Sequence, residues 1–215
     1  MPGKSTRRRR QPRPVRLAER PDIWAFDGFF SDAEIEAVTA LFFDQAWLDE
    51  RAASYGPDKA GFCAEADTTA AAALVSARNR VADALGLPRD AVESVRFRWY
   101  QEGDAHRPHT DAFEMNGTIL AASALIYLSD PEEGGETIFE HSLPAPVRVK
   151  PVRGRLVAWT NLDPHGSTDP HSRHEAMRIR RGEKGALLFF FYLPKPARGV
   201  RIVPHDAPLA GNQPG

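Results

Sequence analysis

Two strong metal-binding side chains stand one residue apart in the short stretch RPHTDAF, residues 107–113. In an extended strand, residues i and i+2 point to the same face, so His109 and Asp111 can reach one point while Thr110 faces away. One imidazole nitrogen and one carboxylate oxygen would then occupy two vertices of an octahedral metal site. The alternative is a solvated polar loop, because a pair of this kind also occurs by chance.

A metal site of this type needs a third ligand, and the second half of the chain offers several histidines. His165, His171 and His174 lie within one polar stretch, DPHGSTDPHSRHEAMRIRRGEKG. Two histidines and one carboxylate form the facial triad of non-haem iron(II) oxygenases, which leaves coordination positions open. The residue types alone do not select among the three histidines.

A lysine, Lys184, stands at the start of the strongly apolar stretch GALLFFFYLP. Burying a lysine there is costly unless it meets an anion, so Lys184 is a candidate for binding an acidic ligand. The alternative is a lysine at the solvated end of a strand, with its stem covering apolar surface. Strand parity puts Phe190 on the same face as Lys184, which makes Phe190 a candidate pocket wall, although plain core also explains it.

The composition indicates one soluble domain, since 215 residues with 42% hydrophobic content suffice for one core. No stretch approaches the roughly 18 consecutive apolar residues of a membrane-spanning helix, and no apolar segment follows the N-terminal basic run. We therefore expect no signal peptide, no membrane partner and a cytoplasmic location. The single cysteine, Cys63, cannot form an internal disulfide, which agrees with a reducing compartment.

Positive charge is concentrated at the N-terminus. Residues 1–16 hold seven basic residues and no acidic one, whereas the rest of the chain carries eight more acidic than basic residues. Proline, repeated like charge and the lack of apolar periodicity predict a disordered basic arm over residues 1–20. The arm could make weak contact with nucleic acid, but an acidic body argues against a nucleic-acid enzyme. Residues 207–215 are expected to form a flexible tail.

Two amphipathic helices are predicted in the first half of the chain. Ser31 and Glu34 match a capping box, and apolar residues follow at helical spacing: Ile35, Val38, Leu41 and Phe42. A second helix is expected from near the stretch DTTA to Gly86, which ends it. Between the helices, residues 49–66 are polar and contain glycine, and a loop of this length is either a functional lid or simply flexible.

The pattern then changes to short strands. Alternating or apolar runs predict about seven of them: VRFRWY, LAASALIYLSD, GGETIF, VRVKP, GRLVAWTNL, GALLFFFYLP and GVRIVPH. Helices followed by strands indicate a mainly β (α+β) domain, built as a helix-buttressed sandwich or barrel. We predict a single domain over residues 21–206, with helical support over about 31–87 and a strand core over about 94–204.

Four stretches follow one another in a specific order within residues 95–193. RWYQEGDAHRPHTDAF carries the H-x-D pair, and ALIYLSDPEEGGETIF carries a strand and a Gly-Gly-Glu-Thr turn. VKPVRGRLVAWTNLDPHGSTDPHSRH leads to a distal histidine, and GEKGALLFFFY carries a lysine ten residues later. Together they resemble the prolyl 4-hydroxylase-like branch of the iron(II)- and 2-oxoglutarate-dependent dioxygenases. The resemblance implies a double-stranded β-helix, or jelly-roll, core buttressed by helices.

The same resemblance implies that His109, Asp111 and His174 are the catalytic residues and the iron ligands. The DPxSxH pattern and the ten-residue step to Lys184 favour His174 over His171, which stays the alternative. Two further histidines are interpreted as surface residues or as neighbours of the ligands: His141 and His165.

Four residues are assigned to the cosubstrate by this resemblance. Lys184 would bind the distal carboxylate of 2-oxoglutarate through a charge-assisted contact. Tyr100 and Tyr127 would offer hydroxyl groups, and Thr137 would add a further contact. A core aromatic whose hydroxyl finds any partner is the alternative interpretation of Tyr127.

The implied activity is insertion of one oxygen atom into an unactivated C–H bond, with 2-oxoglutarate converted to succinate and carbon dioxide. The cofactors would be Fe(II), 2-oxoglutarate and O2, with ascorbate as an optional addition. The substrate would be a free amino acid, a small metabolite or a prolyl residue of a protein. His106 and Arg107 stand where relatives often carry a tyrosine, which leaves peptidyl-proline specificity open. Asp111, in place of Ala or Gly, argues against the halogenase variation.

Two other functions stay open on the sequence. A cupin-like metal-binding protein or lyase could use the same barrel without 2-oxoglutarate, and Lys184 would then be dispensable. A degenerate barrel whose basic arm binds nucleic acid is the other, and it would lose its binding if residues 1–16 were removed.

Overall fold

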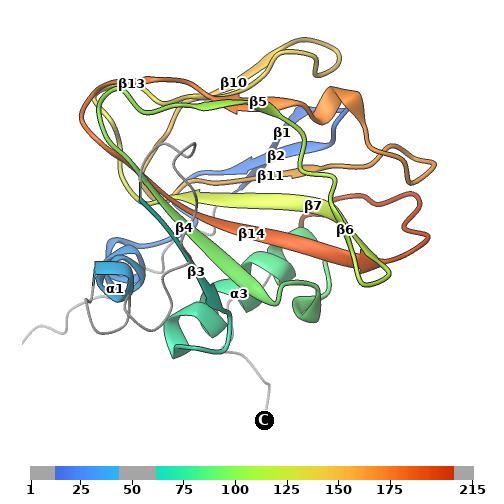
Figure 1. The fold of residues 1–215 in the computed structure, drawn as a ribbon, viewed down its shortest axis with the longest axis horizontal. Coiled ribbons are helices and arrows are strands. Elements are labelled where there is room, and N and C mark those ends of the chain that lie inside the picture. Colours follow the sequence, from blue (N-terminus) through green and yellow to red (C-terminus); the bar gives the residue numbers. More distant parts are fainter. Residues whose placement is uncertain (1–12, 44–61, 206–215) are drawn as a thin grey trace, which may run out of the picture.

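The computed structural model describes residues 13–43 and 62–205, and within these ranges the chain is mainly β with two α-helices (Figure 1). The helices are α1 (Asp32–Phe43) and α3 (Ala72–Leu85), and two 3-10 turns are η1 (Arg89–Ala91) and η2 (Pro170–Ser172). The strands are β1 (Pro14–Ala18), β2 (Ile23–Phe26), β3 (Phe62–Asp67), β4 (Ser94–Tyr100), β5 (His106–His109), β6 (Glu114–Met115), β7 (Thr118–Tyr127), β8 (Glu133–Gly134), β9 (Thr137–Phe139), β10 (Val147–Val149), β11 (Leu156–Thr160), β12 (His174–Ala176), β13 (Ile179–Arg181) and β14 (Lys184–Pro194). The prediction of a mainly β chain is confirmed.

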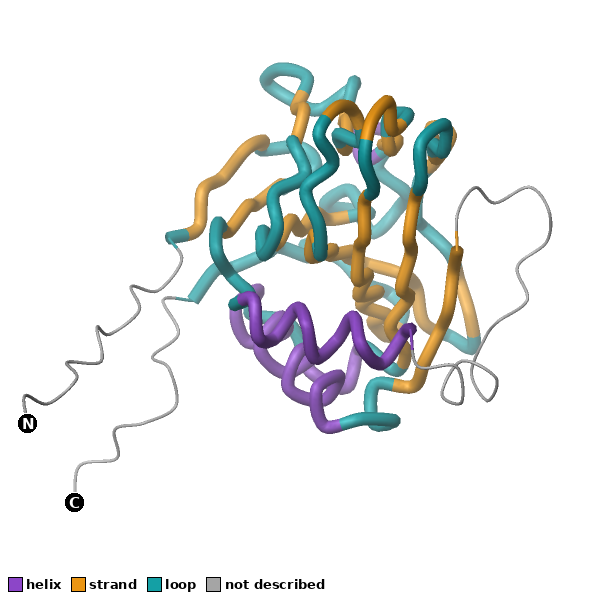
Figure 2. Tube along the Cα trace, turned by 90° about the vertical axis from the view of Figure 1, so that its left-hand side faces the viewer, coloured by secondary structure: helices purple, strands orange, loops and turns teal. Residues whose placement is uncertain are grey.

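The strands form a large sheet and a small sheet that face each other (Figures 1 and 2). The large sheet has the order β1-β2-β11-β7-β14-β4-β3, with β6 also paired to β7, and the small sheet has the order β10-β9-β12-β5. A separate short pair joins β13 to β8. All of these pairings are antiparallel. From β4 to β14 the chain crosses repeatedly between the two larger sheets, so residues distant in sequence meet between them.

The two helices cover the outer face of the large sheet (Figure 2). α1 begins after Ser31, whose backbone N–H donates to the Glu34 carboxylate at 2.8 Å while its hydroxyl accepts from the Glu34 N–H at 3.3 Å. This reciprocal capping box is the one predicted. On the buried side of α1, Phe42 stacks on Phe97 of β4 with ring centroids 4.3 Å apart. Neither described helix has the length and apolar character needed to cross a membrane.

The inner face of the large sheet meets the small sheet across a second apolar cluster. The cluster contains Leu125, Tyr127, Val157 and Trp159 from the large sheet and Phe139 and Val149 from the small sheet. Alternation along β4 sends Phe97 toward the helices and Arg98 toward this inner space. The inner space between the sheets is therefore where the candidate site residues converge.

Strand β1 lies within the segment for which we predicted disorder, so that prediction is wrong from Pro14 onward. β1 extends the edge of the large sheet by pairing with β2, and Arg16 forms an ion pair of 2.7 Å with the buried Asp22. An edge strand tolerates proline and charged side chains, which explains why the composition misled the prediction. Residues 1–12 lie outside the described part of the chain, as do residues 206–215.

The long loop predicted over residues 49–66 is wrong for its last part, because β3 pairs along its length with β4. The rest of that loop, and with it the predicted lid, lies outside the described residues.

The last predicted strand, GVRIVPH, is also wrong. Ile202 is buried, but its N–H donates to Asp22 Oδ2 at 3.3 Å rather than to a neighbouring strand. The Val203 N–H donates to the carbonyl of Leu85 at 3.0 Å, and that carbonyl is one of those left unpaired at the end of α3. The segment caps a helix and does not extend a sheet.

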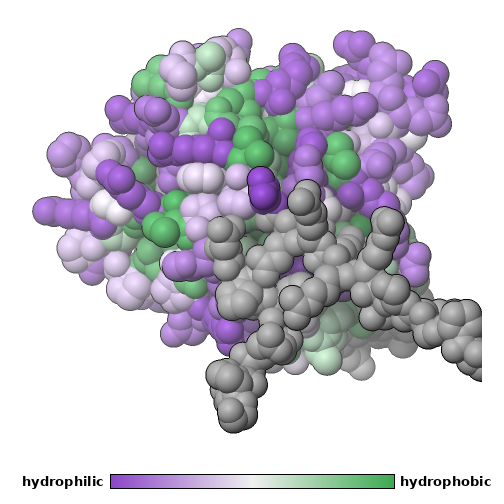
Figure 3. All heavy atoms as spheres, turned by 180° about the vertical axis from the view of Figure 1, so that it is seen from behind, coloured by the Kyte–Doolittle hydropathy of each residue, from purple (hydrophilic) through white to green (hydrophobic). Residues whose placement is uncertain are grey.

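The face shown in Figure 3 is mainly hydrophilic, with a smaller apolar area framed by polar side chains. Among the described residues, the large apolar side chains that stay exposed are Val15, Phe43, Phe113, Met115, Leu143 and Val203. Single exposed apolar residues are ordinary on protein surfaces. Phe113 differs from most of them because it also lines a pocket.

The contact between α1 and β4 can be tested with two adjacent phenylalanines. We expect Phe42→Ala to lower the free energy of unfolding by about 3–5 kcal/mol, since Phe42 is fully buried against Phe97. Phe43 is 54% exposed and meets Phe97 and Trp99 only edge-on, so Phe43→Ala should cost about 1.5 kcal/mol at most. Urea denaturation measures both, and equal losses would contradict this packing.

Candidate active site

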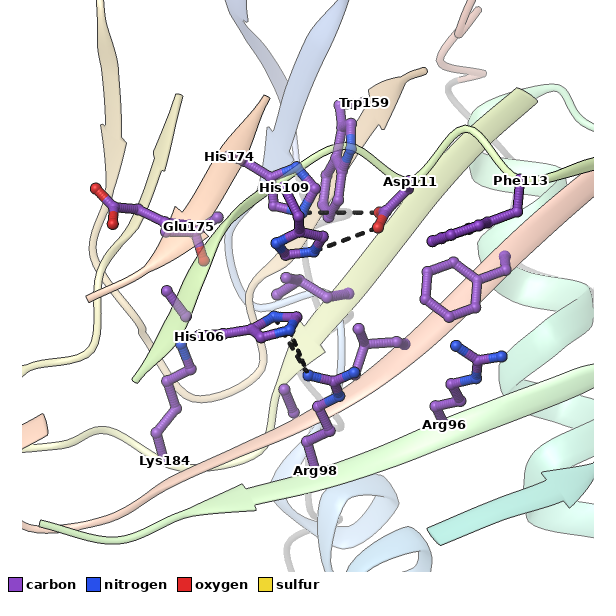
Figure 4. A pocket seen from close by; sticks show the side chains of 16 residues that line it. Arg96, Arg98, His106, His109, Asp111, Phe113, Trp159, His174, Glu175 and Lys184 are labelled. Atoms are coloured by element: carbon purple, nitrogen blue, oxygen red, sulfur yellow. Dashed lines mark hydrogen bonds and ion pairs between the residues drawn. The ribbon is translucent and has the colours of Figure 1, made fainter. Parts of the chain in front are cut away.

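Three potential metal ligands meet between the sheets. His109 ends β5, Asp111 follows two residues later, and His174 begins β12 directly opposite His109 in the antiparallel pair. Their ligand atoms all lie within 4.8 Å of one another. Asp111 lies beside both histidines, with Oδ1 3.4 Å from His109 Nε2 and Oδ2 3.7 Å from His174 Nε2 (Figure 4). The three residues predicted from sequence are thus brought together.

Both histidines are held in the tautomer that a metal requires. His109 Nδ1 lies 2.8 Å from the carbonyl of Arg107, and His174 Nδ1 lies 2.9 Å from the carbonyl of Ser172. A carbonyl oxygen can only accept, so each Nδ1 carries the proton and each Nε2 keeps its lone pair. Hydrogen bonds of this kind orient histidine ligands around metals.

Asp111 is buried and supported from behind. Its Oδ2 accepts a hydrogen bond of 2.9 Å from the Ser123 hydroxyl, which in turn accepts one of 2.8 Å from the Asn161 side-chain amide. Burial raises the pKa of Asp111, but the two histidines and the Ser123 hydroxyl outweigh this and lower it to about 2. Burial lowers the pKa of His174. The cluster therefore offers an ionised carboxylate and a neutral buried imidazole at neutral pH.

The donor set fits iron(II). Two imidazole nitrogens and one carboxylate oxygen on one side of a cation form the facial arrangement of non-haem iron sites. Aromatic rings enclose His174, since Trp159 meets it edge-on at 4.7 Å and Phe139 lies 5.3 Å away. His171, the alternative ligand, is directed elsewhere, with its Nδ1 donating to the carbonyl of His141.

A pocket of about 260 Å³ opens beside these ligands, between the two sheets. Lys184 lines the same pocket, to one side of the ligands, and is only 2% exposed (Figure 4). Its Nζ donates to the carbonyl of Gly135 at 2.8 Å and lies 4.9 Å from the centre of the Tyr100 ring. Burial lowers the pKa of Lys184 to about 7, against the attraction of Glu136. The lysine is therefore not at a solvated strand end.

The Gly-Gly turn is needed at this end of the pocket. Gly135 has a φ of +76°, and a Cβ added there would lie 2.5 Å from Ile179 Cδ1 and 3.3 Å from Lys184 Cδ. The turn thus brings the Gly135 carbonyl to Lys184. A side chain at position 135 would crowd Ile179 and Lys184 and disturb this contact.

The other residues assigned to the cosubstrate lie around the lysine. Thr137 lines the pocket, and its hydroxyl is 2.7 Å from that of Tyr127. Burial raises the pKa of Tyr127, so it stays a neutral phenol. The centre of the Tyr127 ring lies 5.8 Å from Lys184 Nζ, so Tyr127 is the second aromatic ring, after Tyr100, that faces the ammonium group. The Tyr127 hydroxyl is satisfied by Thr137.

Alternate residues in the first part of β14, from Lys184 to Phe190, line the pocket. Phe190 lines it, as strand parity predicts, and is also 93% buried, so both of its interpretations hold. His106 lines the pocket as well, whereas Arg107 is exposed and does not. His141 and His165 are exposed, as predicted.

Comparison with known proteins assigns this arrangement to a family. Residues 95–192 match the model of the 2OG-Fe(II) oxygenase superfamily, a range that contains all three candidate ligands and Lys184. Residues 95–192 belong to this superfamily. Its members use Fe(II), 2-oxoglutarate and O2, which confirms the predicted family and these cofactors, while ascorbate stays a prediction.

Named relatives of the oxygenase domain are prolyl hydroxylases. The chain is 32% identical over 126 residues to the probable prolyl 4-hydroxylase 3 of Arabidopsis thaliana. The aligned region covers 49% of this chain and 44% of that protein. The chain thus spans less than half the length of this curated relative.

Solved structures share the fold. The viral collagen prolyl hydroxylase of Paramecium Bursaria Chlorella virus-1, in its 2OG complex, has a TM-score of 0.65 at 19% identity, covering 83% of this chain and 99% of that one. A prolyl hydroxylase from Trichoplax adhaerens, in complex with a hypoxia inducible factor peptide fragment, has a TM-score of 0.54 at 13% identity, covering 79% and 83%. At these identities the likeness concerns the fold alone.

Sequence reasoning missed the residues behind Asp111 and the arginines of the oxygenase domain's pocket. Ser123 is the one polar residue in the stretch LAASALI, and a polar residue in such an apolar stretch is a usable signal, because a buried polar group needs a hydrogen-bond partner. Arg96 and Arg98 line the pocket. Alternation in a strand puts both arginines on the face of β4 opposite Phe97, but only the packing of the sheets shows that this face lines the pocket.

The support behind Asp111 can be tested by metal binding. We expect Ser123→Ala to weaken Mn(II) binding by roughly 10- to 100-fold, because the carboxylate loses the hydrogen bond that orients it. Titration followed by electron paramagnetic resonance of free Mn(II) measures this affinity. Ser142→Ala is a matched control, since this buried hydroxyl bonds to the carbonyls of Phe139 and Ala145. Equal affinities of the two variants would contradict the role of Ser123.

Proposed function

We propose that this protein is an iron(II)- and 2-oxoglutarate-dependent hydroxylase. The observation that carries the proposal is that the His109, Asp111 and His174 cluster and the buried Lys184 line the same pocket. A dicarboxylate can reach between a metal at the cluster and a lysine facing it. In a metal-binding protein or lyase that does not use 2-oxoglutarate, no anionic ligand would offset the free-energy cost of burying Lys184.

In this proposal His109, Asp111 and His174 hold the metal on one side only. The open side faces the pocket, where Thr137 and Leu125 form part of the wall. When bound, iron(II) and 2-oxoglutarate supply the O2-dependent chemistry that hydroxylates a C–H bond and yields succinate and carbon dioxide. The protein's own part is to fix the ligand geometry through Ser123 and the two backbone carbonyls, and to exclude water with Trp159 and Phe139.

Lys184 is the proposed partner of the distal carboxylate of 2-oxoglutarate. The Tyr100 ring faces the Nζ of Lys184, and Thr137 offers a hydroxyl among the residues that line the pocket. An entering anion stabilises the charged lysine in a site where burial otherwise disfavours that charge. Tyr127 supports this contact by holding Thr137 rather than by reaching the pocket itself.

We also propose that the two facing sheets are a jelly-roll, or double-stranded β-helix, core. Its strands would be β4, β14, β7 and β11 on one side and β5, β12, β9 and β10 on the other, because the chain passes between these two sets as a jelly roll requires. α1 and α3 would buttress its outer face.

The proposed substrate class is a prolyl residue, a free amino acid or a small metabolite. Relatives named as prolyl hydroxylases support the first of these. Asp111 fills the vertex that a halide would need, so hydroxylation is the proposed outcome rather than halogenation.

The metal and cosubstrate assignment is tested by anaerobic titration of the full-length protein with iron(II) and 2-oxoglutarate. A visible charge-transfer band of the chelate is expected in the wild type, and succinate should form when air is admitted with a substrate. His174→Ala should abolish the band, whereas His171→Ala should retain it because His171 is directed toward His141. A wild type without the band, or an undiminished band in His174→Ala, would defeat the proposal.

The pH dependence of cosubstrate binding tests the role of Lys184. Its pKa of about 7 lies below the ordinary 10.5, so above pH 7 the empty site loses the proton that an anion-bound lysine keeps. Affinity for 2-oxoglutarate should therefore fall about tenfold per pH unit from pH 7 to 9, with uptake of a proton. Calorimetry of the Mn(II)-loaded protein in buffers of different ionisation enthalpy measures both effects.

Two variants serve as controls for this measurement. Lys184→Arg keeps its charge at all these pH values, so its binding should show no such slope. Lys184→Met should bind 2-oxoglutarate weakly at every pH. A wild type whose affinity is flat from pH 7 to 9 would contradict the assigned role.

A further inference from the structure

Asn161 is a buried residue behind the metal ligands that the proposed function does not use. It follows directly on β11, is 0% exposed and is not among the residues that line the pocket. Its side-chain Nδ2 donates to the Ser123 hydroxyl at 2.8 Å, and that hydroxyl donates to Asp111 Oδ2 at 2.9 Å. Asn161 therefore reaches a candidate metal ligand through one intervening hydroxyl group.

The backbone fixes Asn161 on both sides. Its N–H donates to the carbonyl of Ala121 in β7 at 2.9 Å, which continues the antiparallel ladder of β7 and β11 beyond the end of β11. Its carbonyl accepts from the N–H of Asp169 at 2.9 Å. Asp169 directly precedes η2, and the last residue of η2 orients the His174 ring. Asn161 thus lies where the supports of Asp111 and His174 join.

The direction of the hydrogen bonds from Asn161 to Asp111 is dictated by the carboxylate. An ionised carboxylate can only accept, so the single proton of the Ser123 hydroxyl must point to Asp111. That hydroxyl can then only accept from its other partner, and the NH2 group of the Asn161 amide faces it. The reverse orientation of the amide would present its oxygen to Ser123 and draw the proton away from Asp111.

This orientation leaves one polar atom of the amide unsatisfied. Asn161 Oδ1 is buried and has no hydrogen-bond partner among the described residues. A buried carbonyl oxygen without a partner destabilises a fold, and an apolar side chain of similar volume would avoid that cost. Stability is commonly given up in this way at functional sites. Fold stability alone therefore does not account for an amide at position 161.

We propose that Asn161 is a positioning residue of the metal site, which directs the Ser123 proton to Asp111 and so holds the carboxylate in its metal-binding orientation. The inference rests on the proposed function, because it concerns the iron ligands assigned there. A hydroxyl that accepts one hydrogen bond is a stronger donor in the next, so the amide both orients and strengthens the contact with Asp111. Without the amide, the Ser123 hydroxyl is free to rotate.

The experiment measures Mn(II) affinity of the full-length protein, by electron paramagnetic resonance of free Mn(II), and the melting temperature of the metal-free protein. Asn161→Leu keeps the branching and approximate volume of the side chain without its polar atoms. It should bind Mn(II) about 10-fold more weakly, because Asp111 loses its fixed orientation. Its melting temperature should equal or exceed that of the wild type, because the unpaired oxygen is removed.

The matched control is Asn79→Leu. Asn79 lies on α3, outside the pocket lining, and its side-chain oxygen accepts from Arg78 Nε at 3.1 Å. Because this amide has no recorded contact with Ser123 or a candidate ligand, Mn(II) affinity should stay at the wild-type value.

A double-mutant cycle separates action through Ser123 from a general disturbance. Asn161→Leu should weaken Mn(II) binding in the wild type but not in Ser123→Ala, because the amide then has no hydroxyl to direct. Asn161→Ala repeats the cycle with a smaller side chain, so that a steric clash of leucine cannot account for the result. The visible band of the anaerobic iron(II) and 2-oxoglutarate complex should move in the same direction in Ser123→Ala and Asn161→Leu, since both change the support of one carboxylate.

The outcomes distinguish this inference from the proposed function. Unchanged Mn(II) affinity in both Asn161 variants, or equal losses with and without Ser123, would overturn the role of Asn161 and leave the metal site intact. A melting temperature that falls in parallel with Mn(II) affinity in both variants would assign Asn161 to fold stability and also overturn the inference. A wild type that binds neither Mn(II) nor iron(II) would overturn the proposed function, and the inference with it.

Discussion

The antiparallel pairing of β5 with β12 is the interaction on which the rest of the site depends. It sets His174 directly opposite His109, although the two strands lie far apart in the sequence. Each histidine then uses a backbone carbonyl two residues upstream to fix its Nδ1 proton, so both Nε2 atoms turn to Asp111. The same local geometry, repeated on two paired strands, gathers three potential metal ligands beside the pocket.

Burial of charge is the second constraint. Asp111 and Lys184 are both nearly inaccessible, and each would be unfavourable in an apolar interior without partners. Asp111 is compensated within the chain by Ser123 and the histidines, whereas Lys184 has one carbonyl and two aromatic faces. The two groups differ chemically: the Asp111 carboxylate could accept a cation, and an anion beside Lys184 would stabilise the charged form of the lysine.

The large sheet has different roles on its two faces. Its outer face carries α1 and α3 and supplies most of the apolar burial, so its inner face can carry charged side chains around a cavity. On that inner face Lys184 contacts the Gly-Gly turn, and Arg96 lies over the Phe190 ring further along the pocket. The separation of Lys184 from Arg96 follows from the register of β14 and β4 and from strand geometry.

The sequence by itself determined the H-x-D pair, the capped start of α1, the two faces of β4 and β14, and, through the order of its motifs, the family. These features depend on local periodicity or on residues close together in the chain, so they can be read without a fold. The tertiary structure decided that His174 rather than His171 joins Asp111, that Ser123 supports it, and that the arginine face of β4 lines the site. The tertiary structure also shows that part of the predicted basic arm forms β1. Pairing between distant strands and burial between sheets depend on the whole chain, and local sequence pattern does not specify them.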